Sequence, residues 1–407
     1  MKLGMLIPEF PTQTHVFFWR EIHALRSEVE VFPISTRRPS EGCPHDFGPS
    51  AAAETHYVYP PGAGALRVLV SNPRGLRRAL EYVRSLSERG PRRLRAAGFL
   101  ACAADLVRYA RRVGLDHIHT HSCADAAHIV AIARLLGGPP YSLHLHGDLA
   151  VYGVDHQQKS RLANFVAAAA KPMERQLANE LGLPPERTCT LTMGVDTTRF
   201  RPRDRPTPPG RVLDLVTVAR LVLGKGHGYA LAALRTAVDR GADVRYAIVG
   251  SGPDRSQIAR EIAALRLGDR VRLLGSLGEQ EVLEQLQQAD VFVLPSVGRF
   301  EASPVSVMEA MACGLPVVAS RVGGIADMIT DGIDGFLVEP EDVAGLAAAI
   351  ERLWRDPALR QRVGEAARRR AAESFDSRAR ARQLVEVIRS SASAGPERLV
   401  VATRGRR

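Results

Sequence analysis

The sequence lacks most of the features that stabilise small secreted domains or hold a chain in a membrane. Its five cysteines, an odd number, show no C-x-x-C spacing, which argues against zinc fingers and against a disulfide framework. No apolar run approaches the roughly 18 residues of a membrane-spanning helix. The N-terminal apolar stretch has the pattern of a short strand and not of a signal peptide, because Pro8 and Glu9 interrupt it. These absences predict a protein that stays in the cytoplasm.

The length and composition fit two globular domains: the chain has 407 residues, of which 45% are hydrophobic and 24% charged. Its net charge of +11 is unevenly spread, because the region from Leu66 to Gly114 holds twelve arginines and three acids, a local charge of +9. Three explanations stay open, in decreasing order of preference. The arginines decorate solvated helices, form a basic amphipathic surface that docks on anionic lipid, or bind nucleic acid. The last has the least support, because no aromatic residues are interleaved with the arginines.

Short apolar runs alternate with helical patterns along both halves of the chain. This alternation predicts a parallel, doubly wound sheet in each half. The segment 201–210 contains four prolines in ten residues and can form neither a central strand nor a helix, so we expect a linker there. The predicted strands cover residues 2–7, 29–34, 117–120, 141–146, 165–169, 213–219, 244–249, 271–274, 291–294, 317–319 and 336–338.

A pair of glutamates follows one of the apolar runs of the second half. Glu301 and Glu309 have seven residues between them. Ser303 can cap a helix, Pro304 suits its first turn, and Gly314 can end it. Glu301 then lies in a loop at the carboxyl end of a strand, which is where open α/β sheets bind ligands. Two carboxylates that face a helix N-terminus suit a ligand with many hydroxyls and a phosphate.

This segment resembles the signature of the family 4 glycosyltransferases, the retaining, nucleotide-sugar-using enzymes of the GT-B fold. Three further motifs in the same order support the resemblance, at residues 218–227 (VARLVLGKGH), 249–253 (VGSGP) and 314–324 (GLPVVASRVGG). The resemblance implies an α/β, GT-B fold of two Rossmann-like, doubly wound domains that face a central cleft. The expected divisions are an acceptor-binding domain 1–200, a linker 201–210, a nucleotide-sugar-binding domain 211–376, a helix 377–390 that crosses back to the first domain, and a disordered tail 391–407.

The resemblance also implies roles for residues of the second domain. Arg220 and Lys225 match the cations that neutralise the diphosphate leaving group, which would make a metal unnecessary. Glu309 matches the residue that accepts hydrogen bonds from the ribose, and Glu301 the one beside the donor sugar. The base is expected near residues 273–276. The expected donor-binding residues are Arg220, Lys225, Gly250, Gly252, Leu274, Glu301, Ser303, Pro304, Val305, Ser306 and Glu309.

In the first domain, a histidine precedes a glycine at the end of the predicted strand 141–146. His146 matches the histidine that relatives place close to the reacting sugar, and alternation puts His144 on the same face of the sheet. The expected catalytic residues are His146, Glu301, Arg220 and Lys225. The loop 8–15 lacks the paired glycines of many relatives. The expected acceptor-binding residues are Thr12, Gln13, Thr14, His15 and Asp148.

Three histidines and a cysteine alternate along the chain from His117 to Cys123, which suggests a metal site. Alternating residues of one strand have Cα atoms about 6.6–6.8 Å apart, so all four cannot close on one ion. We therefore predict no metal.

The expected function is transfer of a hexose-type sugar, with retention, from a UDP-sugar or, second, a GDP-sugar to an acceptor hydroxyl. The pathway would be exopolysaccharide or envelope-glycan biosynthesis, as in the colanic-acid-type enzymes that the motifs resemble. The acceptor would be a glycan, a lipid-linked molecule or a small molecule, and the protein would work in the cytoplasm, peripherally on the inner face of the membrane. The alternatives are a natural-product glycosyltransferase, a nucleotide-sugar 2-epimerase on the same fold, and a basic membrane-binding protein with a dead site.

Overall fold

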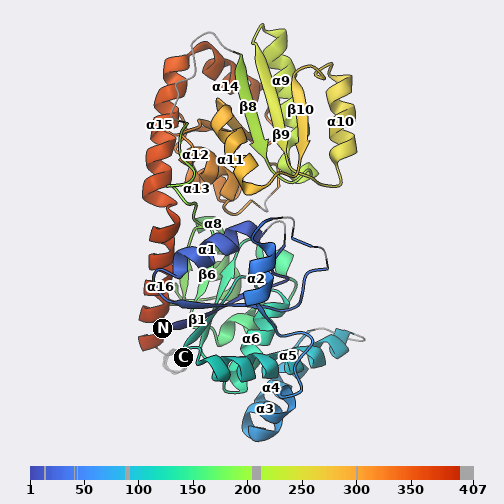
Figure 1. Cartoon of the computed structure of the whole chain (residues 1–407), viewed down its shortest axis with the longest axis vertical. Helices are drawn as coiled ribbons and strands as arrows, with labels where there is room; N and C mark the ends of the chain where they lie inside the picture. The colour runs from blue at the N-terminus through green and yellow to red at the C-terminus, as the bar shows by residue number, and fades with distance from the viewer. Residues whose placement is uncertain are drawn as a thin grey trace. The chain divides into compact units, whose positions relative to one another are not determined.

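The computed structural model divides the chain into two compact units, drawn in Figure 1. The first comprises Met1–Thr192 together with the chain from Arg378 onward, and the second comprises Met193–Ser377. Gln13, Thr14 and most of the predicted linker lie outside the described residues, which are 1–12, 15–40, 42–43, 45–87, 92–203, 212–298 and 301–394.

The first unit is built on a parallel sheet of seven strands in the order β3-β2-β1-β4-β5-β6-β7. The order reverses between β1 and β4, so the crevice at their carboxyl ends is the place where such sheets bind ligands. Most of the side chains of β1, β4, β5 and β6 are buried, as expected for a parallel sheet with both faces covered. The strands are β1 (Lys2–Ile7), β2 (Glu30–Ser35), β3 (His56–Tyr57), β4 (His117–Thr120), β5 (Tyr141–Leu145), β6 (Val166–Ala168) and β7 (Thr188–Thr190).

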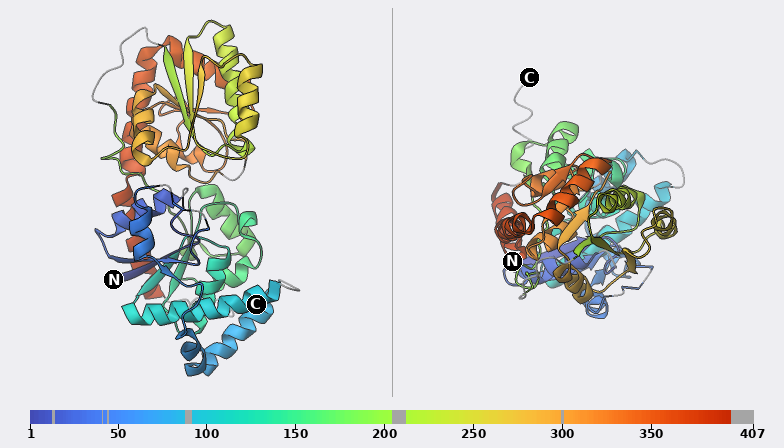
Figure 2. Two further views of the ribbon diagram at one scale, coloured as in Figure 1. Left: turned by 45° about the vertical axis from the view of Figure 1, so that its right-hand side comes forward. Right: turned by 90° about the horizontal axis from the view of Figure 1, so that it is seen from above.

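Helices cover both faces of this sheet, and α4 lies outside α5 as a further layer (Figure 2). The helices are α1 (Val16–Leu25), α2 (Gly48–Glu54), α3 (Ala65–Ser71), α4 (Pro73–Ser85), α5 (Arg92–Val113), α6 (Asp125–Leu135), α7 (His156–Arg161), α8 (Lys171–Leu181) and α16 (Ser377–Ala394), with 3₁₀ turns η2 (Leu149–Tyr152) and η3 (Pro185–Arg187).

Helix α16 completes the core of the first unit although it comes last in the sequence. Its residues Leu384, Val385 and Ile388 are buried in one cluster with Phe18 and Ile22 of α1. The helix ends at Ala394, four residues beyond the predicted end. Residues 391–394, which were predicted to belong to a disordered tail, are therefore helical. The remaining tail residues, 395–407, lie outside the described part of the chain.

The second unit repeats the architecture with six parallel strands in the order β10-β9-β8-β11-β12-β13. Here the reversal lies between β8 and β11. Its strands are β8 (Leu213–Val218), β9 (Val244–Val249), β10 (Val271–Gly275), β11 (Val291–Leu294), β12 (Val317–Ser320) and β13 (Phe336–Val338). Its helices are η4 (Leu223–Lys225), α9 (His227–Asp239), α10 (Arg255–Ala264), α11 (Glu279–Gln288), α12 (Val305–Ala312), α13 (Ile325–Met328), α14 (Val343–Arg355) and α15 (Pro357–Ser374).

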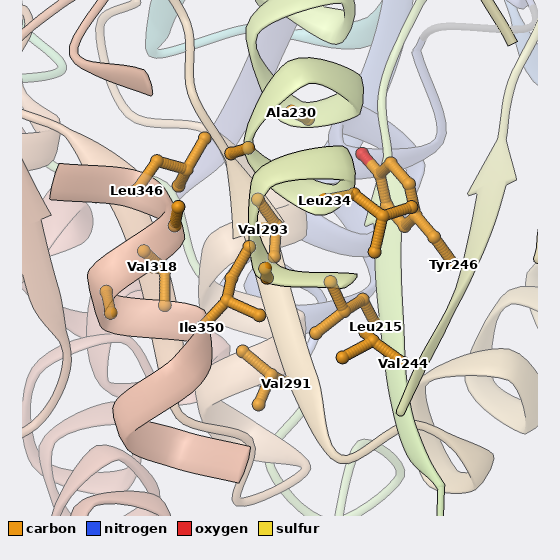
Figure 3. Packing of buried hydrophobic residues seen from close by; sticks show 14 of the residues in the cluster. Leu215, Ala230, Leu234, Val244, Tyr246, Val291, Val293, Val318, Leu346 and Ile350 are labelled. Atoms are coloured by element: carbon orange, nitrogen blue, oxygen red, sulfur yellow. The ribbon is translucent and has the colours of Figure 1, made fainter. Parts of the chain in front are cut away.

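Figure 3 shows the core of the second unit, where α9 and α14 pack on the sheet. Leu234 of α9 and Ile350 of α14 meet Leu215 of β8 and Val293 of β11, and all four are at most 3% exposed. Burial of such side chains contributes about 25 cal/mol per Å² of apolar surface. This packing fixes the strand ends from which the functional loops leave.

Two details of the predicted elements are wrong. The edge strands β3 and β7 were not predicted, because two or three residues carry too little pattern. Ser303 does not cap α12: Pro304 is the N-cap residue, and no side chain caps this end.

Candidate active site

The carboxyl edge of the second sheet brings together a lysine and a glutamate that are far apart in sequence. The Lys225 ammonium in η4, after β8, donates a hydrogen bond to the Glu301 carboxylate in the loop after β11. The Glu301 side chain is 8% exposed and that of Lys225 is 26% exposed. Ser296 Oγ donates a second hydrogen bond to Glu301 Oε1 at 2.7 Å. A buried carboxylate is thus held by two donors, one of which is a cation that is accessible to ligand.

Glycines allow the loops around this pair to approach one another closely. Gly323 has φ of +53°, and a Cβ there would lie 1.8 Å from the carbonyl oxygen of Glu301. The next residue, Gly324, donates its N–H to the same oxygen at 2.8 Å. Gly226 has φ of +72°, and a Cβ there would lie 1.8 Å from the Pro295 carbonyl oxygen. The backbone of both charged residues is therefore fixed by contacts that only glycine permits.

The predicted turn after β9 lies against the loop after β8. A Cβ on Gly250 would lie 1.9 Å from the Ala219 carbonyl oxygen, and one on Gly252 would lie 2.3 Å from that of Leu221. Ser251 accepts the Leu221 N–H at 2.9 Å through its carbonyl oxygen. Leu274, the residue expected near the base, is half-buried in β10. The structure thus brings the loops after β8, β9 and β11 together at this edge of the sheet.

Arg220 begins the β8 loop, and its side chain is exposed. The carbonyl oxygen of Arg220 lies 3.0 Å from Nε2 of His227. Burial lowers the pKa of His227, so the neutral ring donates from Nε2 to this carbonyl. His227 therefore holds the loop that presents both predicted diphosphate cations.

Helix α12 carries the second glutamate of the predicted pair. Glu309 is 6% exposed, one turn into the helix. Burial, with a further contribution from the Glu309 carboxylate, raises the pKa of the Cys313 thiol to about 12. The predicted phosphate donors Val305 and Ser306 lie in the first turn of α12, where no side chain caps the helix. The Ser303 hydroxyl points instead to the Met328 sulfur, at 3.9 Å.

In the first unit, histidines of β4 and β5 form a column on one face of the sheet. Nε2 of His144 lies 2.9 Å from the Leu191 carbonyl oxygen, so that nitrogen must carry the proton. Its Nδ1 then accepts from His119 Nε2 at 3.5 Å, and His119 Nδ1 accepts from the Ser142 hydroxyl at 2.7 Å. Ser142 Oγ in turn accepts from His117 Nε2 at 2.8 Å. Each donor meets an acceptor when all three rings are neutral, and burial lowers the pKa of each ring.

A second set of side chains lies at the carboxyl end of the same strands. His121 Nδ1 is 2.9 Å from Nε2 of His146, and His121 Nε2 is 3.2 Å from Oε2 of Glu21 in α1. The His146 ring lies 4.3 Å from that of His144, centroid to centroid, which confirms the predicted common face. The backbone N–H of His146 donates to the Tyr152 hydroxyl at 2.9 Å.

Among the described residues, His119, His121 and His144 are close enough to hold a metal ion, with nitrogen atoms within 4.8 Å of one another. The sequence prediction considered only the alternating residues of one strand and missed that β5 contributes His144. The facing nitrogens of His119 and His144 nevertheless form a donor–acceptor pair in the hydrogen-bonded column. We therefore explain the column by its hydrogen bonds and assign no metal to it.

The predicted acceptor-binding residues do not share one environment. His15 is packed against the Phe18 ring at 5.1 Å, and burial lowers its pKa to about 4. Thr12 lies in the same loop and is partly buried, while Gln13 and Thr14 lie outside the described residues. Asp148 caps η2, with Oδ1 accepting from the Ala150 N–H at 3.0 Å.

Sequence reasoning missed three residues that support these sites: Ser296, His227 and Glu21. Glu21 could have been noticed in the sequence, because it lies three positions after Phe18 and next to Ile22. Both of these residues are on the buried face of α1. Ser296 and His227 had none, since their roles depend on partners from other loops.

No helix in the described ranges combines the length and apolar character needed to cross a bilayer. Residues 19–199 match the family described as Glycosyltransferase Family 4, and residues 200–370 match Glycosyl transferases group 1. A Salmonella typhimurium protein named for glycosyl transfer in colanic acid biosynthesis is 34% identical over 247 residues, covering 60% of each chain. The amylovoran biosynthesis glycosyltransferase of Erwinia amylovora is 36% identical over 214 residues, covering 51% of this chain and 52% of that one.

The matched stretch therefore spans only 52–60% of the length of these relatives. The crystal structure of Anabaena HepE in complex with UDP has the same fold, with a TM-score of 0.73 at 19% identity, over 96% of this chain and all of that one. With both halves matched in sequence and the two-sheet architecture matched in structure, the chain belongs to the family 4 glycosyltransferases of the GT-B fold.

Proposed function

We propose that the chain is a retaining glycosyltransferase that moves a hexose-type sugar from a nucleotide diphosphate to an acceptor hydroxyl. A UDP-sugar is the favoured donor and a GDP-sugar the next. The observation that carries the proposal is the Lys225–Glu301 pair, at the carboxyl edge of β8 and β11 where the strand order reverses.

In this proposal the fixed cations replace a metal ion. The diphosphate oxygens of the donor take the Lys225 ammonium from Glu301, and the exposed Arg220 guanidinium binds a second pair of oxygens. Glu301 is then free to accept from a sugar hydroxyl. Glu309 accepts from the ribose, and the N–H groups of Val305 and Ser306 donate to phosphate. Stabilisation of the departing diphosphate is the main contribution of these groups to the rate.

The bond changes balance without a nucleophilic side chain. The bond between the anomeric carbon and the β-phosphate oxygen breaks, and the acceptor oxygen forms the new bond on the same face of the sugar. The departing phosphate oxygen takes the proton of the acceptor hydroxyl. His146 donates to or accepts from a donor-sugar hydroxyl, and exclusion of water protects the reaction.

Exopolysaccharide or envelope-glycan assembly is the favoured pathway, supported by relatives named for colanic acid and amylovoran biosynthesis. Glycosylation of a small natural product is the alternative. An epimerase on the same fold would release a product without acceptor, and a non-enzymatic membrane protein would give no product. Product analysis with and without acceptor distinguishes these outcomes.

We further propose that the first unit docks on anionic lipid at the surface formed by α3 and α4. Leu66 and Val70 of α3 are 66% and 67% exposed. Arg74, Arg77 and Arg78 are exposed on α4, the next helix along the chain, which is in contact with α3. Exposed aliphatic side chains together with arginines match the composition of helices that lie in a membrane interface. Such docking would bring the enzyme to a lipid-linked acceptor.

Thermal unfolding with UDP, GDP, ADP or no ligand tests the donor assignment. A nucleotide at about 100 times its dissociation constant stabilises the folded state by roughly 2.7 kcal/mol. We expect UDP to raise the midpoint of the wild type and to lose this effect with Glu309→Ala.

The matched control is Glu365→Ala, because Glu365 is an exposed glutamate on α15 of the same unit. This control should keep the full nucleotide shift. An equal UDP shift in wild type and Glu309→Ala would overturn the ribose assignment, and a shift with GDP alone would change the donor base.

A further inference from the structure

The sheet of the second unit leaves part of one face uncovered. Val244 and Tyr246 of β9 are buried in the core shown in Figure 3, and Val271 of β10 belongs to the same core. Side chains alternate between the two faces of a strand, so Arg245 and Arg272 point to the opposite face. Both are exposed. Parallel sheets normally have both faces covered, so an open face at β9 and β10 calls for an explanation.

The open face is the bottom of a groove of about 600 Å³, a volume in the range of ligand-binding pockets. Val216 of β8 and Ala247 of β9 lie in its floor and are register partners. Arg272 of β10 is the register partner of Ala247 on the other side. Neighbouring strands lie about 4.7–4.9 Å apart, so the floor is about 10 Å wide. A groove of this width accommodates a small molecule or one chain of a linear polymer.

The groove lies at the amino ends of the strands. Asp214 and Arg245 are the second residues of β8 and β9, and Arg270 immediately precedes β10. Lys225 and Glu301 come after the carboxyl ends of their strands. A strand rises about 3.3 Å per residue, so the end of β8 lies about 13 Å from Asp214. The groove is therefore a different place from the candidate active site of this unit.

The charge of the groove is mainly positive. Arg270 donates a hydrogen bond to Oδ1 of Asp243 at 2.8 Å. In the described ranges, by contrast, no hydrogen bond or ion pair holds the guanidinium of Arg245 or Arg272. These two cations lie on neighbouring strands and repel each other, and an anion between them would replace the repulsion with attraction. The charged residues that line the groove are Arg203, Asp214, Arg245, Asp269, Arg270 and Arg272.

The uncharged side chains of the groove suit hydroxyl groups. Gln285 and Gln288 of α11 line it three positions apart, which puts them on one side of the helix. Neither side chain has a hydrogen-bond partner in the described part of the chain. An amide both donates and accepts, as a sugar hydroxyl does.

Two other classes of anionic ligand fit the groove less well. A nucleotide base has no ring to stack on, because the Tyr246 hydroxyl lies 2.6 Å from Thr217 Oγ1 on the opposite face and no other aromatic residue within the described ranges lines the groove. A lipid has no anchor there, since none of the strongly exposed aliphatic side chains of the described residues lines it.

We propose that this groove binds an anionic saccharide. Arg245 and Arg272 hold its phosphate or carboxylate group, and Gln285 and Gln288 bond to its hydroxyls. Guanidinium groups bind both kinds of anion through paired N–H donors, so a free sugar phosphate and a uronate residue of a glycan chain both carry the required chemistry. The inference goes beyond the proposed function and does not depend on sugar transfer.

Isothermal titration calorimetry of the full chain at low salt tests the class of ligand. The probes are glucose 1-phosphate, a trimer of galacturonic acid, glucose and inorganic phosphate. We expect one of the two anionic saccharides to bind at least tenfold more tightly than glucose and inorganic phosphate, and the tighter one identifies the source. No binding would overturn the proposal, and so would equal affinity for inorganic phosphate.

Substitutions in the groove test its place. Arg245→Gln and Arg272→Gln should each weaken binding at least tenfold, because each removes charge-assisted hydrogen bonds. Arg245→Lys keeps the charge but not the paired donors, so it should recover only part of the affinity. Unchanged affinity in both glutamine variants would overturn the proposal.

Two further variants serve as controls. Arg260→Gln should bind as the wild type does, because Arg260 is exposed on α10, which packs on the opposite face of the sheet. Lys225→Ala should also keep the affinity, since Lys225 lies at the other end of the strands. A loss in Lys225→Ala as large as in the groove variants would place the saccharide in the candidate active site and overturn the proposal.

A second measurement needs no variant. Phenylglyoxal modifies accessible arginines, and mass spectrometry reports each site in the wild type with and without the tighter saccharide. Protection of Arg245 and Arg272, with Arg260 unprotected, is the expected result, and equal modification with and without saccharide would overturn the proposal. If no nucleotide-sugar donor gives turnover, the proposed function fails, and these binding measurements still decide the groove.

Discussion

The two units share one architecture but place different chemistry at the ends of their strands. Eleven of the twelve histidines lie in the first unit and only His227 in the second. The first unit buries neutral imidazoles that are joined by directional hydrogen bonds. The second holds the Lys225 ammonium against the Glu301 carboxylate. The comparison shows that one doubly wound architecture can place either neutral, hydrogen-bonded rings or a charged pair at the ends of its strands.

Removing the fixed charge should give the largest change. Lys225→Ala should lower kcat at least 100-fold, because it removes the cation that the proposed function places at the departing diphosphate. The unit should remain folded, as judged by circular dichroism. Lys225→Arg should recover only part of the rate, because a planar guanidinium does not replace a compact ammonium.

Lys171→Ala is the control for this prediction, because Lys171 is an exposed lysine at the start of α8. It should leave kcat unchanged. Near wild-type turnover in Lys225→Ala would place the diphosphate elsewhere and remove the contrast between the units.

Acid should destabilise the first unit more than the second. Burial lowers the pKa of His117 from 6.5 to about 3 and that of His144 to about 4, and it lowers the pKa values of the neighbouring histidines well below 6.5. The folded unit therefore binds fewer protons than the unfolded chain. The contribution of these histidines to the stability of the unit is therefore fully present above pH 6.5. It is lost as pH falls, by up to about 1.4 kcal/mol per pH unit for each histidine. Glu21 acts in the opposite sense. Burial raises its pKa from 4.5 to about 8, so its contribution to stability decreases as pH rises from about 4.5 to 8. One carboxyl group does not offset several imidazoles below pH 6.5.

The two tryptophans allow each unit to be followed separately. Trp19 lies in α1 of the first unit and Trp354 in α14 of the second. Urea unfolding of Trp354→Phe reports the first unit, and that of Trp19→Phe reports the second. Equal losses of stability between pH 7 and 5 would contradict the contrast in buried histidines.

The two units should also differ in how strongly their exposed arginines bind anionic lipid. Replacing Arg74, Arg77 and Arg78 with Gln should weaken binding to vesicles containing anionic phosphatidylglycerol by about 1 kcal/mol per arginine. Sedimentation with vesicles of anionic or neutral composition measures the loss.

The same change of charge in the second unit, at Arg255, Arg260 and Arg272, is the control and should have little effect. Each of these side chains is exposed. Equal losses from both triple variants would mean that net charge alone causes binding.

A loss of stability without a change in charge is expected from a substitution in the backbone beside Glu301. Gly323→Ala should cost about 1–2 kcal/mol for the left-handed conformation, with a further loss from the collision with the Glu301 carbonyl oxygen. Gly332→Ala isolates the first contribution, because Gly332 has φ of +74° and a Cβ there would meet no described atom within 4 Å. Chemical denaturation should show a larger loss in the free energy of unfolding for Gly323→Ala than for Gly332→Ala. Equal losses would mean that the close approach to the Glu301 carbonyl oxygen has no effect on stability.

Local pattern was enough to predict much of the fold. The bounds of β1, β9 and β11 agree with their predicted residues, because their side chains repeat with a clear period between breakers. The contacts of the sites could not be predicted in this way. Lys225 and Glu301 are 76 residues apart, and the resemblance to a family supplied their roles without indicating that they pair. Glu21 and His121 meet only because α1 packs beside the ends of β4 and β5.

Helix α16 has a consequence for the order in which the protein is made. Its apolar side chains complete a core whose other members end at Leu191, and its last buried residue there is Ile388. A ribosome adding about 5–20 residues per second needs roughly 10–40 s to travel between these points. During this time the first unit lacks the α16 side chains that complete its core, while the second unit emerges in full. Chaperones that shield apolar surface on nascent chains would therefore act on the unit that is synthesised first and finished last.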